Sequence, residues 1–137
     1  MTRLFLDANV LFTAAHNPDG KASLVVALAK AGHWEIATSA YCVSEARHNL
    51  ERKYPARLDA LDEILSVARL VADVGEAHCP IALPEKDRPV FASALRCGAD
   101  RFLTGDRRHF GRFMNRPEKT NGLIVQTVAN FLEEITR

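Results

Sequence analysis

Short apolar runs alternate along the chain with longer segments in which apolar residues recur every three or four positions. The short runs have the length of buried strands; they cover residues 3–6, 34–38, 71–74, 101–103 and 123–125. The longer segments have the spacing of amphipathic helices, and several end at Gly or Pro; the first begins at Asn9, and the others cover residues 21–31, 39–54, 58–68, 87–97 and 127–136. Strands that alternate with helices predict a three-layer α/β/α sandwich on a mostly parallel sheet of four or five strands.

The length and composition narrow the class of protein. The chain has 137 residues, the size of one ordinary domain, so we expect a single domain over residues 1–137. It is 47% hydrophobic and 26% charged, which excludes disorder as the main state. No apolar run approaches the ~20 residues that span a bilayer, so no membrane segment is expected. Asp7 and Asn9 interrupt the apolar start of the chain, so we expect no secretory signal.

The cysteines and the net charge exclude further classes. Cys42, Cys79 and Cys97 are odd in number, far apart and without a CxxC pair, so they predict neither a disulfide framework nor a zinc site. We expect small buried cysteines in a reduced, cytoplasmic setting. A net charge of +1 gives no whole-molecule basic field that would favour nucleic acid.

Acidic side chains stand at four informative places. Asp7 and Asp106 each follow a predicted strand, and the carboxyl ends of parallel strands are where such sheets bind ligands. Asp87 opens a predicted helix, and Glu45 points about 130° away from the apolar stripe of its own helix. Each also has a purely structural explanation, since an Asp can cap a helix and a Glu can face solvent.

Convergence of these four carboxylates would require a cation or bound protons. Two unit charges ~4 Å apart repel by about 4 kcal/mol at an effective dielectric of 20. A ligand set of oxygens without histidine suits Mg²⁺ or Mn²⁺ better than Zn²⁺. Such an ion activates water and stabilises the leaving oxygen in phosphodiester hydrolysis.

The order of these residues and their neighbours resembles the PIN-domain nuclease family. Leu6-Asp7-Ala8-Asn9-Val10-Leu11 resembles the opening motif of that family. Three later segments resemble its other acidic motifs; they are Ser44-Glu45, Asp87 before Pro89-Val90-Phe91-Ala92-Ser93-Ala94, and Leu103-Thr104-Gly105-Asp106. The resemblance runs from residue 3 to about residue 131 and leaves residues 75–86 unaligned. The chain length resembles that of stand-alone VapC-like toxins of toxin–antitoxin pairs.

The resemblance implies a function and a set of site residues. It implies a metal-dependent endoribonuclease that leaves 5′-phosphates, in which Asp7, Glu45, Asp87 and Asp106 hold Mg²⁺ or Mn²⁺. Asn9 and Thr104 match accessory positions that support the aspartates or the metal-bound water. It also implies a homodimer and, for a toxin, a cognate antitoxin whose basic or polar side chains would occupy the acidic cleft.

A basic segment supports the expectation of a polyanionic substrate. Residues 96–119 contain seven basic and three acidic side chains, a local charge of +4. Arg107 and Arg108, directly after Asp106, are the predicted phosphate contacts. His109 is left out of the predicted site, because a lone histidine in such a loop is more often structural.

Two other functions are weighed against the nuclease. One is a catalytically silent module of the same fold that binds RNA or a protein. The other is a phosphotransfer or receiver domain, which also places an Asp after its first strand; against it, Asn9 stands where a DxD motif needs its second Asp. The sequence leaves open which RNA is cut and does not exclude DNA.

Overall fold

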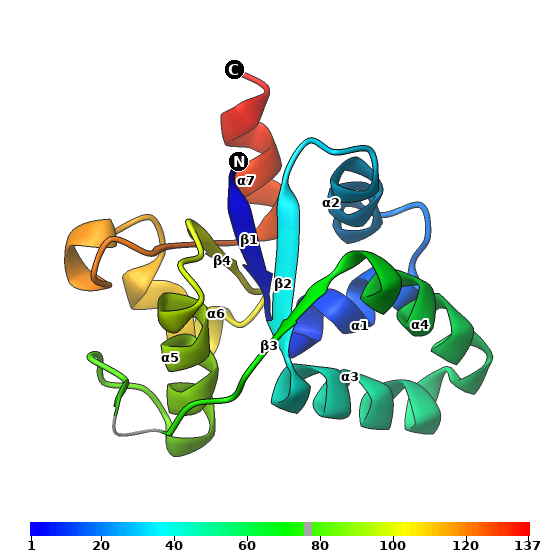
Figure 1. The fold of residues 1–137 in the computed structure, drawn as a ribbon, viewed down its shortest axis with the longest axis horizontal. Helices are drawn as coiled ribbons and strands as arrows, with labels where there is room; N and C mark the ends of the chain where they lie inside the picture. The colour runs from blue at the N-terminus through cyan, green and yellow to red at the C-terminus, as the bar shows by residue number, and fades with distance from the viewer. Residues whose placement is uncertain (76–77) are drawn as a thin grey trace.

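The computed structural model describes residues 1–75 and 78–137 and is built on one five-stranded sheet (Figure 1). The strands are β1 (Arg3–Leu6), β2 (Glu35–Ser39), β3 (Arg69–Val71), β4 (Arg101–Leu103) and β5 (Ile124–Gln126). Their order is β3-β2-β1-β4-β5, and all four neighbouring pairs are parallel. This confirms the predicted parallel sheet.

Helices cover both faces of the sheet, which confirms the three-layer architecture. Their bounds are α1 (Ala8–His16), α2 (Lys21–Lys30), α3 (Ala40–Lys53), α4 (Leu58–Val67), α5 (Arg88–Arg96), α6 (Arg107–Phe110) and α7 (Val128–Ile135). Helix α1 packs against α2, α3 and α4 on one side of the sheet, and α5 and α6 lie on the other (Figure 1). Helix α7 packs against α2, and there Phe131 meets Trp34 edge-on.

The winding of the sheet reverses at β1, and we call the region beyond the carboxyl ends of β1 and β4 the crevice. The chain proceeds from β1 outward to β2 and β3, then returns across the sheet to β4 on the other side of β1. In sheets of this type, ligands bind where the direction of winding reverses, beyond the carboxyl ends of the strands. Leu6 pairs with Leu103 at the ends of β1 and β4. The residues that follow these two strands therefore emerge side by side.

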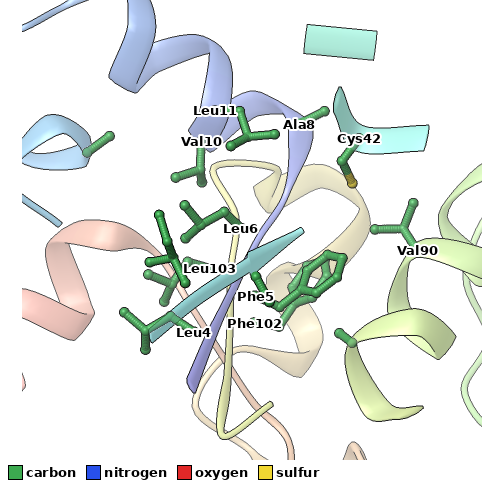
Figure 2. Close-up of a cluster of buried hydrophobic side chains, with 14 of the residues drawn as sticks. Leu4, Phe5, Leu6, Ala8, Val10, Leu11, Cys42, Val90, Phe102 and Leu103 are labelled. Atoms are coloured by element: carbon green, nitrogen blue, oxygen red, sulfur yellow. The ribbon is translucent and has the colours of Figure 1, made fainter. Parts of the chain in front are cut away.

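The core on either face of β1 holds this crevice in place. Leu4 and Leu6 point to one face and Phe5 to the other, where its ring stacks on Phe102 at 5.6 Å (Figure 2). All four side chains are fully buried. Strands buried on both faces are expected to be continuous apolar runs, which explains the pattern of residues 3–6.

The structure corrects the bounds of two predicted strands. The third strand is Arg69–Val71 rather than 71–74, and the last is Ile124–Gln126 rather than 123–125. Strand β3 is an edge strand on which Leu70 is 62% exposed, so its apolar pattern does not mark it. Of the unaligned segment 75–86, residues 76–77 lie outside the described residues, and residues 78–84 hold no α-helix or strand. No helix among the described residues is both long and apolar enough to span a membrane.

Candidate active site

Asp7 is the buried centre of the crevice and caps the first helix. Its side chain is 8% exposed, and Oδ1 accepts the main-chain N–H of Ala8 at 2.8 Å. Oδ2 accepts the Thr104 hydroxyl at 2.8 Å and the side-chain amide of Asn9 at 3.2 Å. Both oxygens of this carboxylate are thus held by donors from its own helix and from the end of β4.

Asn9 and Thr104 join the ends of β1 and β4. The Thr104 hydroxyl accepts the Asn9 amide at 3.2 Å and the main-chain N–H of Asp106 at 3.1 Å. The Asn9 carbonyl oxygen accepts the N–H of Gly105 at 2.7 Å. A Cβ at position 105 would lie 3.3 Å from that oxygen, so glycine suits the close approach. These bonds fix the two predicted accessory side chains around Asp7.

Burial has a clear electrostatic cost at Asp7. Loss of solvent raises its pKa from 3.8 to about 6, although the hydrogen bonds from Thr104 and Ala8 oppose the shift. The negative charges of Asp87 and Glu45 raise the pKa further. These charges act on Asp7 because the crevice brings the separate acidic segments together.

A second group of side chains lies next to Asp7 at the start of α5 and α6. Asp106 caps α6 by accepting the His109 N–H at Oδ1, 3.0 Å away. Its Oδ2 lies 2.7 Å from His109 Nδ1, which is also 3.0 Å from Asp87 Oδ2. The three side chains can each offer one ligand atom within 4.8 Å of the others. The pKa of Asp87 is raised, first by burial and also by the charge of Asp106, while His109 opposes the shift.

This second group has unsatisfied polar atoms. Asp87 Oδ2 and His109 Nδ1 are shielded from solvent; they face each other at the ion-pair distance of 3.0 Å, and neither makes a hydrogen bond among the described residues. Buried polar atoms normally make such a bond. Two carboxylate oxygens and an imidazole nitrogen that gather at one place are also ligand atoms that a divalent cation can take.

The four predicted carboxylates occupy different parts of this crevice. Asp87 and Asp106 belong to the close group, whereas Asp7 and Glu45 lie outside it. Glu45 is half-buried on α3 and is linked to the group by its charge, which raises the pKa of both Asp7 and Asp87. The buried face of α3 is formed by Cys42, Ala46 and Leu50.

Two residues near the site were not predicted to belong to it. His109 stands three positions after Asp106, a spacing that brings the two side chains together at the start of a helix. This spacing is the sequence signal that could have placed His109 in the site. Cys42 Sγ lies 3.9 Å from Asp7 Oδ1. Burial, and then the charge of Asp7, raise the pKa of this thiol to about 12, which keeps it protonated. Cys42 and Cys79 are buried as predicted, whereas Cys97 is half-buried.

Comparison with known proteins gives an answer at the level of fold. No protein-family model and no curated protein matches the sequence. The crystal structure of VapBC2 from Rickettsia felis bound to a promoter DNA fragment contains a similar chain, with a TM-score of 0.67 and 16% identity over 92% of this chain and 98% of that chain. The protein has the PIN-like fold of VapC toxins.

Two further structures show the same PIN-like fold. VapC20 of Mycobacterium tuberculosis, described as a sarcin-ricin loop cleaving toxin, has a TM-score of 0.55 at 17% identity, covering 77% of this chain and 91% of that chain. VapBC-1 of nontypeable Haemophilus influenzae has a TM-score of 0.59 at 14% identity, covering 93% and 99%. At these identities the likeness establishes the fold, and the activity has to be argued from the site.

The basic segment contains arginines that are paired within the fold and arginines that are exposed. Arg101 pairs with Glu134 at 3.2 Å and packs over the Phe131 ring, and Arg112 donates to the Ala82 carbonyl. These two side chains therefore tie the fold together. Arg107 and Arg108 are exposed on α6, directly after Asp106. They remain the predicted phosphate contacts.

Proposed function

We propose that the protein is an endoribonuclease that needs Mg²⁺ or Mn²⁺ and hydrolyses RNA phosphodiester bonds to leave 5′-phosphates. The observation that supports this most is the unsatisfied Asp87 oxygen beside Asp106, next to the buried Asp7. The carboxylates of Asp7, Asp87 and Asp106 gather in one crevice, and the pKa of Asp7 and that of Asp87 are raised there by burial and by neighbouring negative charge. A divalent cation bound there would balance part of this negative charge.

Each residue of the crevice has a part in the proposed reaction. Asp7, Glu45, Asp87 and Asp106 would hold the ion, and Asn9 and Thr104 keep Asp7 oriented through the bonds described above. When bound, such an ion activates water and stabilises the leaving oxygen of the phosphodiester. The exposed guanidinium groups of Arg107 and Arg108 bind phosphates of the RNA backbone and position the strand across the crevice.

We further infer that the nuclease is the toxin of a toxin–antitoxin pair. Two of the similar structures are VapBC complexes, and a third is a toxin that cleaves the sarcin-ricin loop. On this proposal the protein acts in the cytoplasm. A cognate antitoxin then covers the crevice with basic or polar side chains, because the crevice presents carboxylates.

The nuclease proposal is tested by incubating the purified protein with RNA in Mn²⁺, in Mg²⁺ and in EDTA. We expect cleavage only with metal, and products whose 5′ ends carry a phosphate. Asp106→Asn should lower the rate by at least about 100-fold, since removing even an outer partner of a metal site costs 10–100-fold. Asp59→Asn, on the exposed face of α4, is the matched control and should leave the rate unchanged.

Equal cleavage by Asp106→Asn would show that a contaminant cuts the RNA and would overturn the proposal. Absence of cleavage together with absence of Mn²⁺ binding in calorimetry would instead identify the protein as a silent module of the same fold.

We also propose that the protein is a homodimer, as the family resemblance implies. Sedimentation equilibrium should then give twice the 15.2 kDa of one chain. A mass of one chain at all concentrations would contradict it.

A further inference from the structure

His109 lies at the centre of the least satisfied part of the crevice. Its Nδ1 atom is 2.7 Å from Asp106 Oδ2 and 3.0 Å from Asp87 Oδ2. The two carboxylates come from separate segments, one at the start of α5 and one at the start of α6. The imidazole therefore faces two acidic groups that are distant along the chain.

Capping of α6 does not account for this position of the ring. The main-chain N–H of His109 already satisfies Asp106 Oδ1, which completes the cap without the side chain. The ring nitrogen instead lies at ion-pair distance from the other oxygen of Asp106 and from Asp87 Oδ2, and it makes no hydrogen bond among the described residues. The side chains of His109 and Asp87 are 26% and 15% exposed, so few waters can satisfy these atoms.

We propose that His109 Nδ1 is a direct ligand of the divalent ion, together with Asp87 and Asp106. The inference rests on the metal site of the proposed function but not on RNA being the substrate. It changes the ligand set from the all-oxygen one that the sequence predicts to a mixed set of oxygen and nitrogen.

A nitrogen ligand alters which ion the site prefers. Mg²⁺ is a hard ion that takes oxygen ligands and loses water reluctantly, whereas imidazole binds first-row transition ions. The site therefore prefers Mn²⁺ over Mg²⁺, and His109 is the residue that sets this preference. Removing the imidazole should weaken Mn²⁺ binding by at least about tenfold and change Mg²⁺ binding much less.

Pulsed electron paramagnetic resonance of the Mn²⁺-loaded full chain tests this directly, with no RNA present. A bound imidazole nitrogen gives a nitrogen hyperfine coupling to Mn²⁺, which a purely structural histidine does not give. We compare the unaltered protein with His109→Ala, with His109→Asp and with the control His48→Ala, which alters an exposed histidine of α3. Calorimetry on the same four proteins gives the affinities for Mn²⁺ and Mg²⁺.

We expect the nitrogen coupling in the unaltered protein and in His48→Ala, and its loss in both His109 variants. His109→Asp, which replaces nitrogen by oxygen, should narrow the preference for Mn²⁺ over Mg²⁺. Bound Mn²⁺ without nitrogen coupling, or coupling that persists in His109→Ala, would overturn the inference.

The same experiment separates this inference from the nuclease proposal. Nitrogen coupling in a protein that cuts no RNA leaves the ligand assignment standing and removes the nuclease. Metal-dependent cleavage by a protein without nitrogen coupling leaves the nuclease proposal standing and removes His109 from the metal ligands. Failure to bind Mn²⁺ at all would overturn both.

Discussion

The two halves of the crevice differ in how far their polar atoms are satisfied. In the closed half, formed by Asp7, Asn9 and Thr104, the carboxylate of Asp7 accepts three hydrogen bonds from N–H and O–H groups and a longer one from the Cys42 thiol. In the open half, formed by Asp87, Asp106 and His109, one carboxylate oxygen and one ring nitrogen have no hydrogen-bond partner among the described residues.

The difference follows from the backbone that holds each half. Asp7 and Thr104 directly follow two strands whose register is fixed by pairing and by the stacked rings of Phe5 and Phe102. Asp87 and Asp106 stand on short helical turns at the surface. The closed half thus holds one carboxylate in a fixed orientation. The open half supplies ligand atoms that a cation from solution can bind.

The largest expected effect comes from Asp7→Asn, which removes the charge of the closed half. The pKa of Asp7 is about 6 in the folded protein, against 3.8 for an ordinary aspartate, so the folded state binds the proton more tightly. Stability of the metal-free protein therefore falls as pH rises from about 4 through about 6, by about 3 kcal/mol in total. Asp7→Asn should be more stable than the unaltered protein by this amount at pH 7, and cleavage should fall by at least about 100-fold.

Urea unfolding in EDTA at pH 3.5 and at pH 7 measures this effect. The stabilisation by Asp7→Asn should be present at pH 7 and absent at pH 3.5. A difference of the same size at both pH values would show that the burial of the Asp7 charge is not its cause.

Metal binding tests the open half. Mn²⁺ at about 100 times its dissociation constant should raise the free energy of unfolding by about 3 kcal/mol, because the ion binds only the folded state. Asp87→Asn should lose most of this gain while changing the stability in EDTA by less than about 1 kcal/mol. Thermal or urea unfolding with and without Mn²⁺ measures both quantities, with Asp59→Asn as the control. An undiminished gain in Asp87→Asn would remove Asp87 from the metal ligands.

Thr104→Val tests the hydrogen bonding of the closed half. It removes the donor to Asp7 and the acceptor for the Asp106 N–H while it keeps the side-chain shape. We expect a loss of about 2 kcal/mol in the free energy of unfolding, because buried polar atoms are left unpaired. Thr104→Ser retains the hydroxyl and should recover most of the loss. Equal destabilisation by both variants would mean that packing of the methyl group matters more than the hydroxyl.

The smallest effect is expected outside both halves, at Arg107 and Arg108. Each contact with a single-stranded phosphate contributes about 0.7 to the salt dependence of the binding constant. The double substitution to Gln should lower that slope by about 1.4 in RNA-binding titrations carried out in EDTA. Lys30→Gln, at the exposed end of α2, is the matched control and should leave the slope unchanged. An unaltered slope in the double variant would exclude these two arginines from the RNA interface.

The sequence predicted the closed half better than the open half. Asp7 and Thr104 follow strands that are continuous apolar runs, so their place at the sheet edge could be inferred from local pattern and strand alternation. His109 could not be placed, because its contact with Asp87 depends on how α5 and α6 pack. The pairing of Arg101 with Glu134 has the same origin, since only tertiary structure brings β4 against α7. The predicted bounds of strand β3 were wrong because an exposed edge strand has few apolar residues to mark it.

The hydrogen bond between Thr104 and Asp7 joins residues that lie 97 positions apart in a chain of 137. Such a long-range contact forms only after most of the polypeptide has been synthesised. A nascent chain on the ribosome therefore contains Asp7 long before it contains Thr104, which orients the Asp7 carboxylate. On the proposed ribonuclease function, this timing delays the appearance of activity until translation of the protein's own message is nearly finished.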